Sequence, residues 1–206
     1  MKRRAALGKT LRGAWHAFIV IGAIGAIGIV STIALSPRLA WADKAPVELN
    51  QNWTQAQLAG EGELRFFGLH IYDSRLWIPV GTNPRTLSDD WTRQTLALEI
   101  EYARRFDGRD IAQRSIKEMK RQAQISDEAS QRWMDLMTRV IPDVDRGDRI
   151  TGIHMPGERT RFFHNGRYTG EIADADFTRL FFGIWLSPKT SEPALRAALL
   201  GIAAKR

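Results

Sequence analysis

The sequence contains no cysteine among its 206 residues. This absence excludes disulfide bonds, thiol catalysis, zinc sites built from thiolates and the lipid-modified cysteine of a lipoprotein. The sequence also lacks a G-x-S-x-G nucleophile motif, a phosphate-binding glycine loop and a histidine pair at metal-ligand spacing. We therefore expect neither a metal site nor a cofactor.

Charge is absent between residues 13 and 37, and residues 17–35 within that gap are strongly apolar. Basic residues precede the gap, and the small-x-small sequence Ala40-Trp41-Ala42 follows it. A basic start, an apolar centre and a small-residue cleavage site are typical of a secretory signal peptide. We predict that residues 1–42 direct export, that cleavage follows Ala42 and leaves Asp43 first, and that the protein is periplasmic.

A membrane anchor is the alternative interpretation of the same segment. A helix of 19 residues spans roughly 29 Å, about the thickness of a bilayer core. If residues 1–42 are kept, the domain hangs from the inner membrane, and membrane contact is expected only through residues 17–35.

Six of the seven net positive charges lie in the predicted export segment. Residues 1–42 hold six of the 30 lysines and arginines and no acidic residue, which leaves 24 basic and 23 acidic residues beyond them. A nearly neutral domain offers no electrostatic case for nucleic-acid binding. The remaining chain has the length of one domain with its own core, and we divide it into an extended leading segment, 43–59, and a folded domain, 60–206.

The pattern of apolar residues predicts strands followed by helices, twice over. Residues 63–78 are typical of a strand with a bend at Gly68, and residues 95–102 alternate as a half-buried strand does. Helices are expected after Asp107 and Ser126, then a three-stranded meander over 149–172 with turns at Pro156-Gly157 and Asn165-Gly166. Two further helices follow, the first capped by Asp174 or Asp176 and the second opening at Ser191, so the order is that of an α+β fold with an antiparallel sheet covered by helices.

Two stretches carry a resemblance to a known family. GEGELRFFGLHIYDSRLW (60–77) resembles the opening strands of the chalcone isomerase-like fold, and DADFTRLFFGIWLSPKTSEPALRAALLG (174–201) resembles the closing helices of its bacterial exported branch. The segment PDVDRGDRITGIHMPG (142–157) fits the same branch. The resemblance implies a curved antiparallel sheet with helices packed on one face and a cleft between them.

The resemblance also implies candidate site residues. Tyr72 falls where fatty-acid-binding relatives have a tyrosine and the plant isomerases a threonine, and its hydroxyl can donate to a carboxylate or carbonyl oxygen. Arg65 lies one position beyond the arginine that family members use to hold a carboxylate, and a one-residue slip turns a strand side chain to the other face. A bulge near Gly68 would restore its direction.

Strand parity adds further candidates for the same cleft. His70 and Ser74 share a face with Tyr72, whereas Arg75 lies on the opposite face and is expected to pair with Glu99 or Glu101. Tyr102 and Arg114 are candidates by position, and each of these residues also has a purely structural interpretation.

Three functions remain open at this point. The first is non-catalytic binding of an apolar carboxylate, such as a fatty acid, in the cleft. The second is an isomerase, an intramolecular lyase that polarises the ketone of a phenolic ligand with Tyr72 or Arg65. The third is an envelope structural or partner protein without a small ligand. The displaced arginine and the tyrosine in place of threonine favour binding.

The export interpretation predicts a chain that begins at Asp43. Intact-mass measurement of the protein purified from its native host would detect this N-terminus directly. A chain that still carries residues 1–42 would identify residues 17–35 as a membrane anchor.

Overall fold

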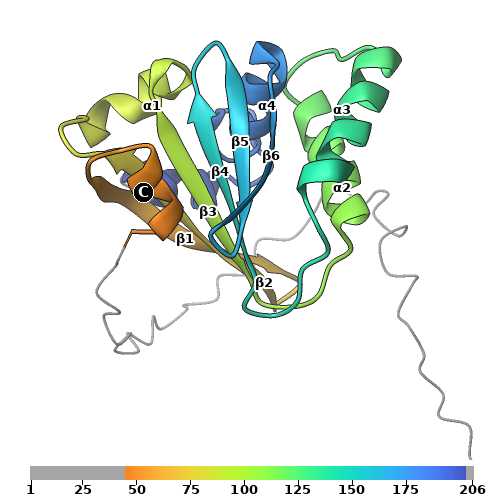
Figure 1. Cartoon of the computed structure of the whole chain (residues 1–206), viewed down its shortest axis with the longest axis horizontal. Coiled ribbons are helices and arrows are strands. Elements are labelled where there is room, and N and C mark those ends of the chain that lie inside the picture. The colour runs from red at the N-terminus through yellow and green to blue at the C-terminus, as the bar shows by residue number, and fades with distance from the viewer. Residues whose placement is uncertain (1–44, 203–206) are drawn as a thin grey trace, which may run out of the picture. The chain divides into compact units, whose positions relative to one another are not determined.

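The computed structural model describes residues 45–202, and the predicted export segment lies outside this range. Six strands form one antiparallel sheet in sequence order, each paired with the next (Figure 1). This α+β architecture confirms the predicted fold class. The strands are β1 (Ala56–Phe66), β2 (Leu69–Pro79), β3 (Leu96–Tyr102), β4 (Arg149–Met155), β5 (Arg159–His164) and β6 (Arg167–Ile172).

Four helices pack against one face of the sheet. Helix α4 crosses β4 and β5, α5 lies on β1 and β2, and α3 packs on β6 with α2 beside it. Their bounds are α2 (Gly108–Lys120), α3 (Asp127–Val140), α4 (Ala175–Leu186) and α5 (Pro193–Leu199). The shorter helical turns are η1 (Val47–Gln51), η2 (Pro84–Thr86), α1 (Leu87–Asp90) and η3 (Trp91–Arg93).

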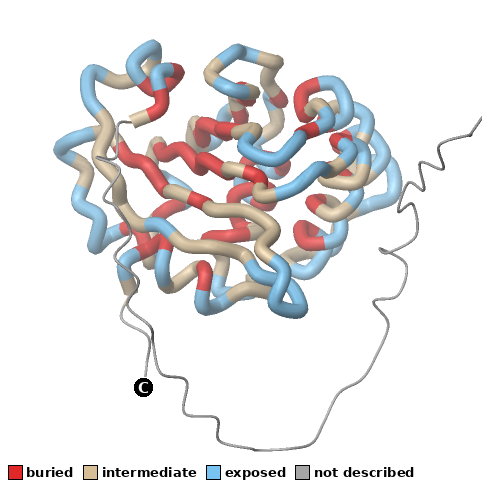
Figure 2. Tube along the Cα trace, turned by 90° about the horizontal axis from the view of Figure 1, so that it is seen from below, coloured by how far each residue is buried: buried red, intermediate tan, exposed pale blue. Residues whose placement is uncertain are grey.

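The main core lies between the sheet and these helices. Alternate residues of each strand point to it, and they meet an aromatic row on α4 formed by Phe177, Phe181 and Trp185. Figure 2 shows the buried stretches running through the interior of the fold. Ser126 and Asp174 accept hydrogen bonds from the backbone amides of Ala129 and Phe177, as the predicted N-caps of α3 and α4 should.

The other face of the sheet is covered in part by η1. Leu49 packs with Trp77, Ala97 and Phe163, which point away from the helices. The fully buried Glu48 accepts a hydrogen bond of 2.6 Å from the Thr151 hydroxyl and faces the Arg149 guanidinium at 3.3 Å. The segment predicted to be extended over 43–59 therefore differs from that prediction. It contains the helical turn η1, which the buried Glu48–Arg149 ion pair holds against the sheet, and β1 already begins at Ala56.

The single strand predicted over 63–78 is two strands joined by a tight hairpin. Phe66 pairs with Leu69, and the two turn residues Phe67 and Gly68 have φ values of 47° and 77°. The turn residues of the predicted hairpin, Asn165 and Gly166, have similar positive φ values of 50° and 82°. Asn-Gly is the favoured pair for such a turn, whereas phenylalanine rarely adopts positive φ, so the sequence concealed the first hairpin.

A bulge follows this hairpin. Leu64 of β1 pairs with Tyr72 of β2, but the next β1 residue, Arg65, pairs with His70. Ile71 is thus an extra residue in β2, and an extra residue reverses the side-chain alternation beyond it. Tyr72 therefore points to the helices, while His70 points away from them.

Among residues 45–202, no helix combines the length and the apolar character that crossing a bilayer requires.

We predict that Phe67→Asn stabilises the fold. Asparagine tolerates positive φ, so the free energy of unfolding should rise by about 1 kcal/mol, measured by urea denaturation. Leu69→Asn is the matched control, because it removes another exposed side chain without changing a positive-φ position, and it should give no gain. A loss of stability in Phe67→Asn would mean that the ring packs within the fold.

Candidate functional site

A row of apolar and aromatic side chains crosses the helix-facing side of β1, β2 and β3 near the hairpin. Leu64, Tyr72 and Tyr102 are cross-strand partners, and the Tyr102 ring lies 5.7 Å from the ring of Phe106. Tyr102 is buried, whereas the other three are only half-buried. We define these four residues as the tyrosine row.

Tyr72 occupies the centre of this row because of the bulge at Ile71. Its hydroxyl oxygen accepts a hydrogen bond of 2.9 Å from the indole nitrogen of Trp185 on α4. The phenolic proton is not used in that bond, so the hydroxyl can still donate to an oxygen acceptor. Tyr102 packs edge-on against Tyr72 at 6.2 Å between ring centroids, and its hydroxyl has no hydrogen-bond partner among residues 45–202.

The protonation of both phenols is set mainly by burial. Burial raises the pKa of Tyr72 well above its ordinary value, and the Trp185 hydrogen bond only partly opposes this. Burial raises the pKa of Tyr102 in the same way. Both hydroxyls are therefore neutral hydrogen-bond donors at any physiological pH.

Charged side chains from the helices surround Tyr72. Its pKa is raised further by the carboxylates of Glu192 and Glu118 and lowered by the guanidinium of Arg114. Arg114 forms an ion pair of 2.9 Å with Glu118 on the next turn of α2. Burial raises the pKa of Glu192, while the charge of Arg114 opposes the increase. Two carboxylates and one guanidinium therefore act on the phenol from the helix side, and Glu192 has the largest effect of the three.

Of the predicted site residues, Tyr72 and Tyr102 pack together and the charge of Arg114 acts on Tyr72, whereas three others do not join them. Ser74 faces the helices, but it is buried and donates to the Gly62 carbonyl at 2.9 Å. Arg65 is half exposed, and its Nε lies 2.8 Å from the Glu63 carboxylate. The extra residue of the bulge belongs to β2, so the direction of the Arg65 side chain on β1 does not change. The expectation that His70 shares a face with Tyr72 was wrong, because the same bulge reverses His70.

The reversed His70 joins a polar cluster on the outer side of the hairpin. Its Nε2 lies 3.3 Å from Asp73 and 4.0 Å from Glu63. The three side chains are close enough to share an ion, and the buried His70 Nε2 makes no hydrogen bond among residues 45–202. Glu63, however, is already paired with Arg65 at 2.8 Å. We assign no metal to this cluster. Arg75 pairs with Glu99 and Glu101, both at 3.4 Å, which confirms that sequence prediction.

Sequence reasoning missed Trp185 and Glu192 as neighbours of Tyr72. Trp185 follows Phe177 and Phe181 at helical spacing, a pattern that indicates core packing and describes its ring but not its indole N–H. No sequence pattern connects Trp185 to a strand residue 113 positions away. Phe106 lies outside any regular element and carried no periodic signal.

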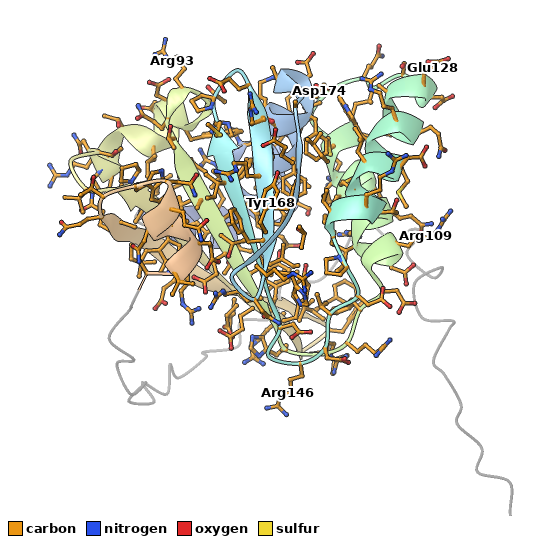
Figure 3. The ribbon with its side chains drawn as sticks, in the orientation of Figure 1. Arg93, Arg109, Glu128, Arg146, Tyr168 and Asp174 are labelled. Atoms are coloured by element: carbon orange, nitrogen blue, oxygen red, sulfur yellow. The ribbon has the colours of Figure 1, made fainter. Side chains whose placement is uncertain are left out.

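A hollow of about 570 Å³ lies at the opposite end of the sheet from the tyrosine row. Its lining includes His154, Arg93 and Arg179, and Arg93 projects at that end in Figure 3. The His154 Nδ1 lies 2.8 Å from the Gln94 carbonyl oxygen, and burial lowers its pKa. Both arginines are paired with acids, Asp90 and Asp176, so the hollow has little capacity for another anion.

Comparison with known proteins gives three findings. Residues 43–201 match the sequence model of a family described as chalcone isomerase-like. An uncharacterized protein of Haemophilus influenzae is 28% identical over 145 residues, which cover 70% of this chain and 68% of that protein. The crystal structure of a fatty-acid binding protein of Arabidopsis thaliana is similar with a TM-score of 0.53 at 14% identity, over 70% of this chain and 86% of that one. That structural likeness shows a shared fold.

The contact between Tyr72 and Trp185 predicts different costs for removing the two hydroxyls. Tyr72→Phe leaves a buried indole N–H without its acceptor, so the free energy of unfolding should fall by about 1–2 kcal/mol. Tyr102→Phe removes a hydroxyl without a partner among the described residues and should cost less than about 0.5 kcal/mol. Equal losses in the two variants, measured by urea denaturation, would contradict this description of the site.

Proposed function

This chain belongs to the chalcone isomerase-like family, and on that premise we propose that it binds an apolar carboxylate, such as a fatty acid, without catalysing a reaction. The observation that carries the proposal is the Tyr72 hydroxyl, a neutral donor with its proton unused, at the centre of a half-buried apolar row. A carboxylate needs donors, and an apolar chain needs a surface from which it can exclude water.

The residues have distinct roles in this proposal. Tyr72 donates its phenolic proton to one carboxylate oxygen, and Trp185 keeps the phenol oriented. Arg114 supplies the positive charge, because its guanidinium has five N–H donors and the ion pair with Glu118 leaves some of them available. Leu64, Tyr102 and Phe106 provide the apolar contact for the hydrocarbon chain next to the carboxylate.

The fold of a fatty-acid binding protein supports this ligand class, since the two chains share an architecture. The separation of Arg65 from Tyr72 argues against the isomerase alternative. A catalyst of that type needs donors aimed together at the oxygen on which charge develops. Arg65 instead lies beside Glu63 on the outer side of the hairpin.

The place of action in this proposal is the periplasm. It is supported by the basic start, the apolar segment 17–35 and the small-residue site at Ala42. A lipid acid is a ligand that an exported domain meets at the membranes on either side of that compartment.

Calorimetric titration with dodecanoate to octadecanoate tests the proposal. Tyr72→Phe should raise the Kd roughly tenfold or more, because a hydrogen bond to a charged acceptor contributes about 1.5–3 kcal/mol. Arg114→Gln should raise it by a similar factor.

Arg65→Gln is the matched control for that titration. It removes an arginine at the same end of the sheet that faces away from the tyrosine row, so the Kd should not change. Binding that is insensitive to Tyr72→Phe and Arg114→Gln would contradict the assigned site, and turnover of a chalcone would contradict a non-catalytic role.

A further inference from the structure

The tip of the β1–β2 hairpin exposes large apolar side chains. Phe67 is 87% exposed, Leu69 is 50% exposed and Phe66 is 36% exposed, and they lie within four consecutive positions. Only three other large apolar side chains among residues 45–202 are exposed, and they are spread over three other segments. A contiguous exposed apolar patch marks an interaction surface more often than an accident of sequence.

The turn chemistry strengthens this interpretation. Phe67 has a φ of 47°, a region that phenylalanine rarely adopts. The same chain builds the same two-residue turn from Asn165-Gly166, the pair that suits it. The first hairpin instead has phenylalanine at a positive-φ turn position, where this residue type is unfavourable. The result is an aromatic ring, that of Phe67, exposed to solvent at the tip. Strained positions of this kind cluster at functional contacts.

The position of the tip indicates what it contacts. The strand register places four segments at one end of the sheet (Figure 1): the hairpin tip, the loop after β3, the loop before β4 and the β5–β6 turn. The first described residues arrive at the same end, because Val47 lies against Gly166 in the β5–β6 turn and is itself 60% exposed. Only eleven residues, 36–46, separate the apolar segment 17–35 from Val47, at most about 40 Å of extended chain.

We propose that this end of the sheet docks on a phospholipid bilayer, with Phe67 and its neighbours Phe66 and Leu69 inserted among the lipids. This surface goes beyond the proposed ligand site and does not require it. An aromatic ring is suited to the interface between headgroups and acyl chains. The short connection to residues 17–35 favours a membrane over a second protein, since these residues hold this end close to the bilayer before cleavage or as a retained anchor. After cleavage the exposed apolar tip alone provides the contact.

Apolar insertion rather than net charge drives the contact in this proposal. Arg104, Arg146 and Arg167 are exposed at this end and have no ion pair among residues 45–202, and Arg146 projects there in Figure 3. However, Asp143 and Asp145 neutralise Arg105, and Glu63 neutralises Arg65. Binding should therefore persist at high salt, where purely electrostatic attraction is screened.

The docked orientation has a consequence for the tyrosine row. Leu64 and Tyr72 are the third and fourth residues outward from the turn on their strands, so the apolar tip and the row are continuous. A bilayer around the tip brings the row to the membrane surface, where an apolar acid can pass between lipid and protein without crossing water.

The absence of cysteine makes a direct test straightforward, because one introduced thiol can be labelled without background. Phe67→Cys and, as the control, Glu158→Cys are labelled with an environment-sensitive nitrobenzoxadiazole dye. Glu158 is exposed in the β4–β5 turn, at the opposite end of the sheet. The full chain, as its host processes it, is mixed with vesicles of phosphatidylethanolamine and phosphatidylglycerol in 0.1 M and 1 M salt.

We expect the label at position 67 to shift to the blue and brighten at least twofold with vesicles at both salt concentrations, and the label at position 158 to stay unchanged. No change at position 67 would overturn the proposal. A change that grows with protein concentration without vesicles would also overturn it, because a second copy of the chain would then cover the tip.

A second variant separates docking from folding. With the dye at Leu69→Cys, the added substitution Phe67→Asn should abolish the vesicle-dependent shift while it raises the temperature of unfolding. Retention of the shift would contradict a role for the Phe67 ring. Fatty-acid titration of Phe67→Asn in the absence of vesicles should give an unchanged Kd, so failure here is distinguishable from failure of the proposed ligand site.

Discussion

One extra residue in β2 determines which side chains of the first hairpin meet the helices. Ile71 has no counterpart in β1, so Tyr72 faces Leu64 and the helices while His70 and Arg65 lie together on the outer side. Without the bulge, strand alternation would direct His70 to the same side as Tyr72. The bulge therefore separates a polar, solvent-facing hairpin surface from an apolar, aromatic one, and the proposed ligand site depends on that separation.

Contacts on both faces of the sheet stabilise the positions of Tyr72 and of the leading segment. On the helix side, Trp185 donates to Tyr72, so α4 fixes the phenol that the strand presents. On the other side, the buried Glu48 joins η1 to β4 through Thr151 and Arg149. A buried carboxylate without such partners would cost several kcal/mol, so the position of the leading segment is specified by this contact.

Sequence patterns predicted the regular parts of the fold and about half of the site. Periodicity, caps and the Asn165-Gly166 turn led correctly to the helix order and the meander, because those signals are local. The first hairpin was concealed because its turn uses phenylalanine in a glycine- or asparagine-type conformation. The family resemblance indicated Tyr72, and position indicated Tyr102 and Arg114. Neither indicated Trp185 or Glu192, since they act on Tyr72 only through tertiary packing. His70 was misplaced because strand parity fails at a bulge.

The central claim is that an apolar acid lies with its carboxylate at Tyr72 and its chain along the tyrosine row. Isotope-edited nuclear Overhauser measurements on the protein with a fatty acid labelled with ¹³C next to its carboxylate test this most directly. The account predicts contacts from the labelled methylene to the ring protons of Tyr72 and Tyr102. Contacts instead to His154 and Pro156, at the hollow on the opposite end of the sheet, would contradict it.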